Sequence, residues 1–240
     1  LGMGVPVTEA KAECSDVSIG AMGWASGEVI TAVATFVLEQ GYGCSVLVVP
    51  TDTVPAVTSL AENGQPDIAP EVWKNSATIY DELEASGKVI TASNVFANGS
   101  EEGWWIPTSL AKKHPELKTL EGVLANPELV GSRFHNCPVG WGCRIVNDNL
   151  KIVHQLEANG IEVFDHSSGA NLRASIAAAF ADNKLWFGYY WGPTAVLGNY
   201  EMTKVDIGDV DPARHAINQS PESPGDKLTP SGFQSEPVLN

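Results

Sequence analysis

Strand-like and helix-like segments alternate along the chain from residue 16 to about residue 200. The first unit is the clearest. Residues 16–21 alternate like a strand, Ser26 is a suitable cap for the helix that follows, and the uninterrupted apolar run 44–49 suits a buried parallel strand. A β-α-β unit needs its helix packed on a parallel sheet, so this pattern predicts an α/β fold.

The alternation continues in two blocks that are joined near residues 98–110. The expected helices are 53–63, 76–86, 144–159 and 170–182, the expected strands are 67–72, 131–137, 161–164 and 185–191, and residues 88–97 are expected to be extended. Two such blocks predict two lobes. We expect lobe 1 to comprise residues 1–107 and 193–240, and lobe 2 to comprise residues 108–192. Residues 218–240 are rich in proline, so we expect an irregular or disordered tail there.

The charge of the chain excludes some classes of partner. The sequence has 29 acidic and 14 basic residues, which gives a formal net charge of −15. Nucleic acids and anionic membranes are polyanions, so we expect neither as a partner, whereas a cationic or zwitterionic ligand fits this charge. No apolar run reaches the roughly 18 residues that a membrane span needs. The chain begins at Leu1, and we expect a processed form whose lack of a signal peptide does not indicate the cytoplasm.

Four cysteines allow two disulfides in three pairings. Cys137 and Cys143 enclose five residues, among them Pro and Gly, and so short a loop can bring the two thiols together. Cys14 precedes one expected strand and Cys44 begins the next, which makes them candidates for a second bridge. Two bridges would indicate an oxidising compartment. The alternative is four buried thiols in a cytosolic protein.

Tryptophan is as frequent as phenylalanine, and most of the seven tryptophans sit beside Gly or Pro at the ends of expected strands. Ligands of open α/β sheets bind outside the carboxyl ends of the strands, so tryptophans there would face a crevice. The alternative is that each indole caps the hydrophobic core. An indole face attracts a methylated ammonium, which is positive, weakly hydrated and has no N–H to donate. The tryptophans that carry this hypothesis are Trp24, Trp73, Trp104, Trp141 and Trp191.

A second contact for such a ligand lies next to Trp141. Three or four indole walls supply on the order of 2–8 kcal/mol, whereas micromolar binding requires about 8 kcal/mol. A helix is expected to begin just after Trp141, so the backbone N–H groups of Gly142, Cys143 and Arg144 would lack helical partners and carry the positive end of the helix dipole. These groups could bind a carboxylate or an oxide oxygen.

Three stretches carry a resemblance to a known family. NCPVGWGC at 136–143, YYWGP at 189–193 and PDIAPEVW at 66–73 resemble motifs of the substrate-binding proteins of ABC importers for glycine betaine and related methylated amines. The resemblance extends from residue 16 to about residue 200. It implies a two-lobed periplasmic binding protein of type II, with its ligand in the cleft between the lobes.

The resemblance also implies which residues contact the ligand. In that family a cage of tryptophans from both lobes holds the methylated ammonium, and the anionic end of the ligand lies on backbone N–H groups. A disulfide between Cys137 and Cys143 is implied as well. Carried onto this sequence, the cage is Trp73, Trp141 and Trp191 with Trp24 and Trp104 as further walls, the backbone contact is Gly142 and Cys143, and Glu71 is an acidic contact.

The sequence departs from the family in three respects. Some betaine binders place a His shortly after the position of Trp73, but residues 74–77 contain none, which weakens the case for betaine itself. The acids Glu71, Glu101 and Glu102 resemble the branch that takes trimethylamine N-oxide, although each could instead be a solvated surface acid. The chain also ends earlier than the family usually does, so we expect the C-terminal part of lobe 1 to be incomplete.

The resemblance implies an ABC permease and its ATPase as partners, a periplasmic or other extracytoplasmic location, and closure by hinge motion near residues 98–110 and 192–205. We expect a monomer without cofactor, metal or enzymatic activity. An enzyme acting on a methylated amine is one alternative. Residues 165–168 contain triad residue types, but consecutive strand residues point to opposite faces, and His135 with nearby cysteines lacks a further zinc-ligand pair. The other alternative is the ligand-sensing lobe of a receptor.

Overall fold

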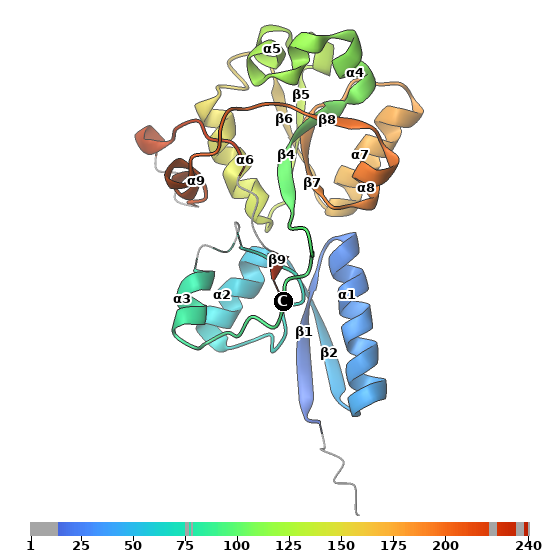
Figure 1. Cartoon of the computed structure of the whole chain (residues 1–240), viewed down its shortest axis with the longest axis vertical. Coiled ribbons are helices and arrows are strands. Elements are labelled where there is room, and N and C mark those ends of the chain that lie inside the picture. The colour runs from blue at the N-terminus through green and yellow to red at the C-terminus, as the bar shows by residue number, and fades with distance from the viewer. Residues whose placement is uncertain (1–13, 75–76, 78, 221–224, 234–237, 240) are drawn as a thin grey trace, which may run out of the picture.

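The chain forms two bodies, each with its own β-structure (Figure 1). This computed structural model describes residues 14–74, 77, 79–220, 225–233 and 238–239. We call the lower body in Figure 1 lobe 1 and the upper body lobe 2. Among the residues with a described position, no helix combines the length and apolar character that a bilayer span requires.

Lobe 1 is built on two parallel strands. Its elements are β1 (Asp16–Met22), α1 (Ala25–Phe36), a π-helical turn (Val37–Tyr42), β2 (Ser45–Thr51), α2 (Thr53–Asn63), β3 (Val72–Trp73), α3 (Tyr80–Ala85) and β9 (Val238–Leu239). A disulfide between Cys14 and Cys44 joins the starts of β1 and β2. The expected β-α-β unit and the expected second bridge are therefore confirmed.

The expected burial of the second strand is wrong. Leu47 in the middle of β2 is 64% exposed. Within the described part of the chain, β2 pairs only with β1, so one of its edges has no strand beside it. An apolar run fits a buried strand and an exposed edge strand equally well, and the run alone does not show how many neighbours the strand will have.

The C-terminal segment returns to lobe 1. β9 pairs with β3 in antiparallel orientation, and Trp73 lies opposite Val238. The expected irregular tail is therefore wrong at this strand, whereas residues 221–224 and 234–237 of that tail lie outside the described residues. The expected strand at 67–72 is reduced to β3 and to a single bridge between Ile68 and Ile19. No named strand forms within residues 88–97.

Lobe 2 contains a five-stranded sheet in the order β6-β5-β7-β4-β8. Its strands are β4 (Glu101–Pro107), β5 (Arg133–Asn136), β6 (Glu162–Asp165), β7 (Gly188–Gly192) and β8 (Met202–Lys204). β5 is parallel to β6 and β7, whereas β4 is antiparallel to β7 and β8. Pairing thus assigns β4 and β8 to this sheet, although both lie outside residues 108–192. The exact lobe boundaries stay a prediction.

Helices lie on both sides of the lobe 2 sheet in Figure 1, with α6 (Gly142–Val153) and α9 (Pro212–Asn218) on one side and α7 (Gly169–Ala181) and α8 (Ala195–Asn199) on the other. The remaining two, α4 (Thr108–Lys113) and α5 (Leu120–Ala125), lie at the upper ends of the strands. Phe134, Phe187 and Ile176 are fully buried in the core between the sheet and these helices. This core holds the ends of the strands in place, and the loops that follow them supply much of the ligand-binding site.

Candidate ligand-binding site

Residues from both lobes line one cavity. The lining combines Trp24, Thr53 and Trp73 of lobe 1 with Glu102, Trp141, Gly142, Cys143, Tyr189 and Trp191 of lobe 2. The cavity is small, because the space that the centre of a water-sized sphere can reach within it is about 30 Å³. Pockets for drug-sized ligands span roughly 300–1,000 Å³, so this cavity suits only a much smaller ligand.

Four indoles form a chain of edge-to-face contacts that crosses between the lobes twice. We call Trp24, Trp73, Trp141 and Trp191 the cage. The ring centroids of Trp24 and Trp141 are 5.3 Å apart, those of Trp141 and Trp191 5.1 Å, and those of Trp191 and Trp73 6.5 Å, with interplanar angles of 78°, 85° and 89°. Rings at right angles form walls on different sides of one space, which is the arrangement that surrounds a cation with π-faces.

A buried carboxylate lies behind the lobe 1 half of the cage. Trp24 is the N-cap residue of α1, and Trp73 lies in β3. Glu71 is completely buried, and its Oε1 accepts hydrogen bonds from Trp73 Nε1 at 3.0 Å and from Ser26 Oγ at 3.1 Å. Burial raises the pKa of Glu71, and these donors oppose the rise. The structure thus places Glu71 behind Trp73 and not in the cavity lining.

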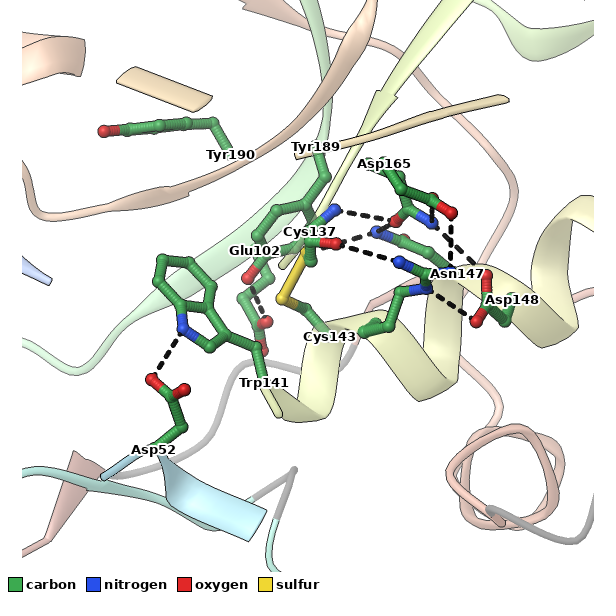
Figure 2. The surroundings of a disulfide bond; sticks show 12 residues. Asp52, Glu102, Cys137, Trp141, Cys143, Asn147, Asp148, Asp165, Tyr189 and Tyr190 are labelled. Carbon is green, nitrogen blue, oxygen red and sulfur yellow. Dashed lines mark hydrogen bonds and ion pairs between the residues drawn. A yellow bond between two sulfur atoms is a disulfide. The ribbon is translucent and has the colours of Figure 1, made fainter. Parts of the chain in front are cut away.

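Trp141 is held from both lobes. It is the N-cap residue of α6 and lies in the loop that the Cys137–Cys143 disulfide closes, as the resemblance implied. Its Nε1 donates a hydrogen bond to Asp52 Oδ1 of lobe 1 at 2.9 Å (Figure 2). Gly169 at the start of α7 lies directly against the ring, because a Cβ there would be 2.8 Å from it.

A polar network fixes the base of this disulfide loop (Figure 2). Asn136 at the end of β5 accepts a hydrogen bond from the Asn147 side chain at 2.9 Å. Arg144 forms ion pairs with Asp148 of its own helix and with Asp165 of β6, each at 2.7 Å. Because these contacts join the loop, α6 and the sheet, the loop loses little freedom when a ligand binds.

The first turn of α6 also faces the cavity. Gly142 and Cys143 both line it, as expected for a backbone contact to the anionic end of a ligand. Their N–H groups have no intrahelical acceptor at this position in a helix. The backbone N–H of Arg144, in contrast, donates to the carbonyl oxygen of Trp141 at 3.2 Å, so it is engaged in the turn itself.

The structure places one predicted wall elsewhere. Trp104 is fully buried in lobe 2, and its Nε1 donates to Asn147 Oδ1 at 2.9 Å. Its ring packs against Phe134 and Phe187, with centroids 4.7 and 5.8 Å away. Trp104 lies in the middle of β4 and not at a strand end, so the sheet and its covering helices enclose it. It is a core residue and not a lining residue.

Sequence reasoning missed several residues at the site. Tyr189 lies two positions before Trp191 on β7, and side chains two apart share one face of a strand, so this spacing could have identified it. Thr53 begins α2 just after β2, which is the same strand-end signal that identified the tryptophans. Glu102, in contrast, is one of the three acids that the sequence analysis names, and it is not a solvated surface acid: it is 3% exposed, lines the cavity and accepts a hydrogen bond from the Tyr189 hydroxyl (Figure 2). Glu101 is exposed and does not line the cavity.

Among the described residues that line the cavity, one is acidic, Glu102, and none is basic. Burial raises the pKa of Tyr189 strongly, and the Glu102 carboxylate reinforces the rise, so the Tyr189 hydroxyl keeps its proton and donates a hydrogen bond to that carboxylate. Burial likewise raises the pKa of Asp52, opposed by the indole of Trp141 and the amide of Gly23. Such a field favours a cation over an anion.

The residues behind the alternative hypotheses lie outside the cavity lining. Asp165 is ion-paired with Arg144, and His166 lies 2.9 Å from His135, measured from Nε2 to Nδ1. Burial, together with the charges of His166 and Arg133, lowers the pKa of His135 to about 3. No group of three or more potential metal ligands occurs in the part of the chain that the structure describes.

The sequence matches a protein family over residues 15–235. That family is described as the substrate binding domain of ABC-type glycine betaine transport systems. No curated protein sequence matches the chain.

Several solved structures share the fold. The glycine betaine, L-proline-binding protein ProX of Borrelia burgdorferi is 17% identical with a TM-score of 0.64, and covers 93% of this chain and 74% of its own. Lactococcal OpuAC, in its closed form complexed with glycine betaine, is 16% identical with a TM-score of 0.63. The match covers 94% of this chain and 76% of the OpuAC chain. A choline-binding protein in complex with choline is 21% identical with a TM-score of 0.61. The match covers 78% of this chain and 63% of the choline-binding protein. These likenesses show the expected two-lobed fold of type II periplasmic binding proteins.

Proposed function

The chain belongs to the family of substrate-binding domains of ABC-type glycine betaine transport systems, and from this premise we propose that it captures a small methylated amine in the cage. The ligand is of the trimethylamine N-oxide or glycine betaine type. One observation carries the proposal: four indoles from two lobes stand at nearly right angles around a cavity, and no basic residue lines it within the part of the chain that the structure describes. Each indole face contributes roughly 0.5–2 kcal/mol toward a desolvated cation.

The lining supports an orientation for the ligand. The methylated nitrogen lies among the indoles, and its oxide or other anionic end points to the N–H groups of Gly142 and Cys143 at the positive end of the α6 dipole. Glu102 lies in the same small cavity. A ligand carboxylate would be repelled by that acid, so we propose that a ligand with a smaller anionic end, such as trimethylamine N-oxide, binds more tightly than glycine betaine.

Calorimetric titration against trimethylamine N-oxide, glycine betaine, choline, carnitine and dimethylsulfoniopropionate tests this proposal. We expect at least one ligand of the panel to bind with a micromolar Kd, and trimethylamine N-oxide to bind more tightly than glycine betaine. Binding of none of them would overturn the proposal. The ligand should be recovered unchanged after long incubation, since a transport component releases what it binds, and turnover would favour the enzyme alternative.

We further propose that the closed form docks on an ABC permease with its ATPase in an extracytoplasmic compartment, and that the protein acts as a monomer. The two disulfides and the family support this location. Hinge movement between the lobes would admit and release the ligand, because residues of both lobes line the cavity. Uptake by vesicles that contain the permease and ATPase should require this chain and should fail when a cage tryptophan is removed.

A further inference from the structure

We infer that Asp52 is a positioning residue that fixes Trp141 within the cage and latches the two lobes together. The inference rests on the proposed function, since it concerns the same cavity. Asp52 belongs to lobe 1 and Trp141 to lobe 2, and the hydrogen bond between them is 2.9 Å long (Figure 2). Asp52 does not line the cavity, so it acts on a ligand only through the indole that it holds.

The backbone position of Asp52 predicts that its side chain caps a helix, but the side chain bonds to the other lobe instead. Asp52 is the N-cap residue of α2, where an Asp side chain usually accepts a hydrogen bond from the first turn of the helix. Its side chain makes no such bond. Asp211, the N-cap residue of α9, shows the usual arrangement, with its Oδ1 accepting from the backbone N–H groups of Ala213 and Arg214 at 3.0 and 3.1 Å. The carboxylate of Asp52 leaves its own helix and reaches the other lobe.

Two glycines make room for this carboxylate. A Cβ on Gly23 of lobe 1 would lie 3.0 Å from Asp52 Oδ1, and a Cβ on Gly140 of lobe 2 would lie 3.0 Å from Oδ2. Gly140 has a φ of +93°, which a residue with a side chain rarely adopts. A backbone hydrogen bond of 3.4 Å from Val54 N to Gly140 O joins the lobes at the same place. The carboxylate therefore sits in a narrow slot between the lobes.

The orientation of Trp141 governs the cage, because its ring is the one that contacts both Trp24 and Trp191. Separation of the lobes must break its hydrogen bond to Asp52. The ring of Trp141 then loses the acceptor that fixes it and its contact with Trp24 at the same time. Asp52 therefore couples closure of the lobes to completion of the cage.

Substitution of Asp52 tests this coupling with trimethylamine N-oxide and choline as probes. Asp52→Ala removes the acceptor, and we expect the Kd of each ligand that binds to rise at least about tenfold, with faster dissociation. Asp52→Asn keeps an acceptor oxygen for the indole and should restore most of the affinity. Asp211→Ala is the matched control, because it removes an Asp that caps its helix, away from the cavity, and should lower stability without changing Kd.

A second measurement needs no ligand. The indole N–H of Trp141, assigned in a ¹H–¹⁵N spectrum through the loss of its resonance in Trp141→Phe, should exchange slowly with solvent. Asp52→Ala should abolish that protection, and Asp52→Asn should retain it. If the wild type binds no ligand of the panel, the proposed function fails, while protection that depends on Asp52 would still support the latch. Unchanged protection together with unchanged affinity in Asp52→Ala would overturn it.

Discussion

At the scale of single residues, carboxylates and aromatic side chains occur in pairs around the cavity. Each carboxylate accepts a hydrogen bond from an aromatic group, so the bond that orients the ring also brings negative charge close to it. Both effects favour a bound cation. The pairs are Glu71 with Trp73, Asp52 with Trp141, and Glu102 with Tyr189.

Removal of a cage indole should weaken binding. We expect Trp141→Ala and Trp191→Ala each to raise the Kd of the best panel ligand at least about tenfold, which corresponds to roughly 1.4 kcal/mol. Trp104→Phe is the control, because Trp104 is a core residue that hydrogen-bonds to Asn147. It should lower the free energy of unfolding and leave Kd unchanged. Calorimetry with both alanine variants at wild-type affinity would contradict the cage assignment.

The free energy of unfolding should depend on pH in a way that Glu71 determines. Folding raises the pKa of Glu71, mainly through burial, so the folded state takes up a proton more readily than the unfolded state. The cost of the buried charge is present above the raised pKa and disappears as the pH falls through the raised pKa toward 4.5. Glu71→Gln lacks this charge at every pH.

Denaturant unfolding of wild type and Glu71→Gln at several pH values measures this pH dependence. The difference in the free energy of unfolding, variant minus wild type, should be largest above the raised pKa and should shrink as the pH falls toward 4.5. Contributions of the other acids cancel in the difference. A difference that does not change with pH would show that Glu71 does not titrate in this way.

The sequence predicts the aromatic partners at this scale better than the acidic ones. Trp24, Trp73 and Trp141 were identifiable because each lies beside a turn at the end of an element. The same criterion selected Trp104 wrongly, because Gly103 beside it lies within a strand and not at its end. Asp52 could not be recognised, since its position before a helix predicts a cap and only the fold shows that its side chain bonds to the other lobe.

At the scale of elements, the disulfide loop and the helix after it are the part of the site that the sequence predicts best. The start of α6 was predictable from the residues, and the bridge was implied by the family resemblance, since the short loop between its cysteines allows that pairing without requiring it. Long-range features were not predictable in this way. The exposure of β2 depends on how many strands lie beside it, and the pairing of β9 with β3 joins segments far apart in the sequence.

Opening the loop disulfide should affect binding more than stability. The paired substitution of Cys137 and Cys143 by Ser leaves the Arg144 network in place, so we expect a rise in Kd smaller than that of Trp141→Ala. The paired substitution of Cys14 and Cys44 by Ser is the matched control. It should lower the free energy of unfolding by about 2–4 kcal/mol and change Kd less than twofold. The opposite pattern in the two variants would contradict this assignment.

At the scale of the whole molecule, two lobes share one cavity, so a ligand that binds there is linked to the stability of both. The division into two lobes was predictable from the two blocks of alternating strands and helices. The expected boundaries cut through the lobe 2 sheet, because β4 and β8 contribute antiparallel strands that a simple β-α-β pattern does not anticipate.

Saturating ligand should therefore protect both lobes together. At a ligand concentration of about one hundred times Kd, the free energy of unfolding should rise by about 2.7 kcal/mol. Hydrogen exchange should slow in the turn between β1 and α1 and in the first turn of α6, since these segments contribute walls from opposite sides. Protection confined to one lobe would contradict a shared site.

The pairing of β9 with β3 has a practical consequence for assays that immobilise the protein. Val238 lies opposite Trp73, so a chip linkage, bead or fluorescent fusion attached directly after β9 would crowd the strand that pairs with one wall of the cage. Attachment before β1 lies beside the Cys14–Cys44 bridge, which joins the starts of β1 and β2 and includes no cage residue. Affinities recorded with the two attachment points should differ, and only the second should match calorimetry in free solution.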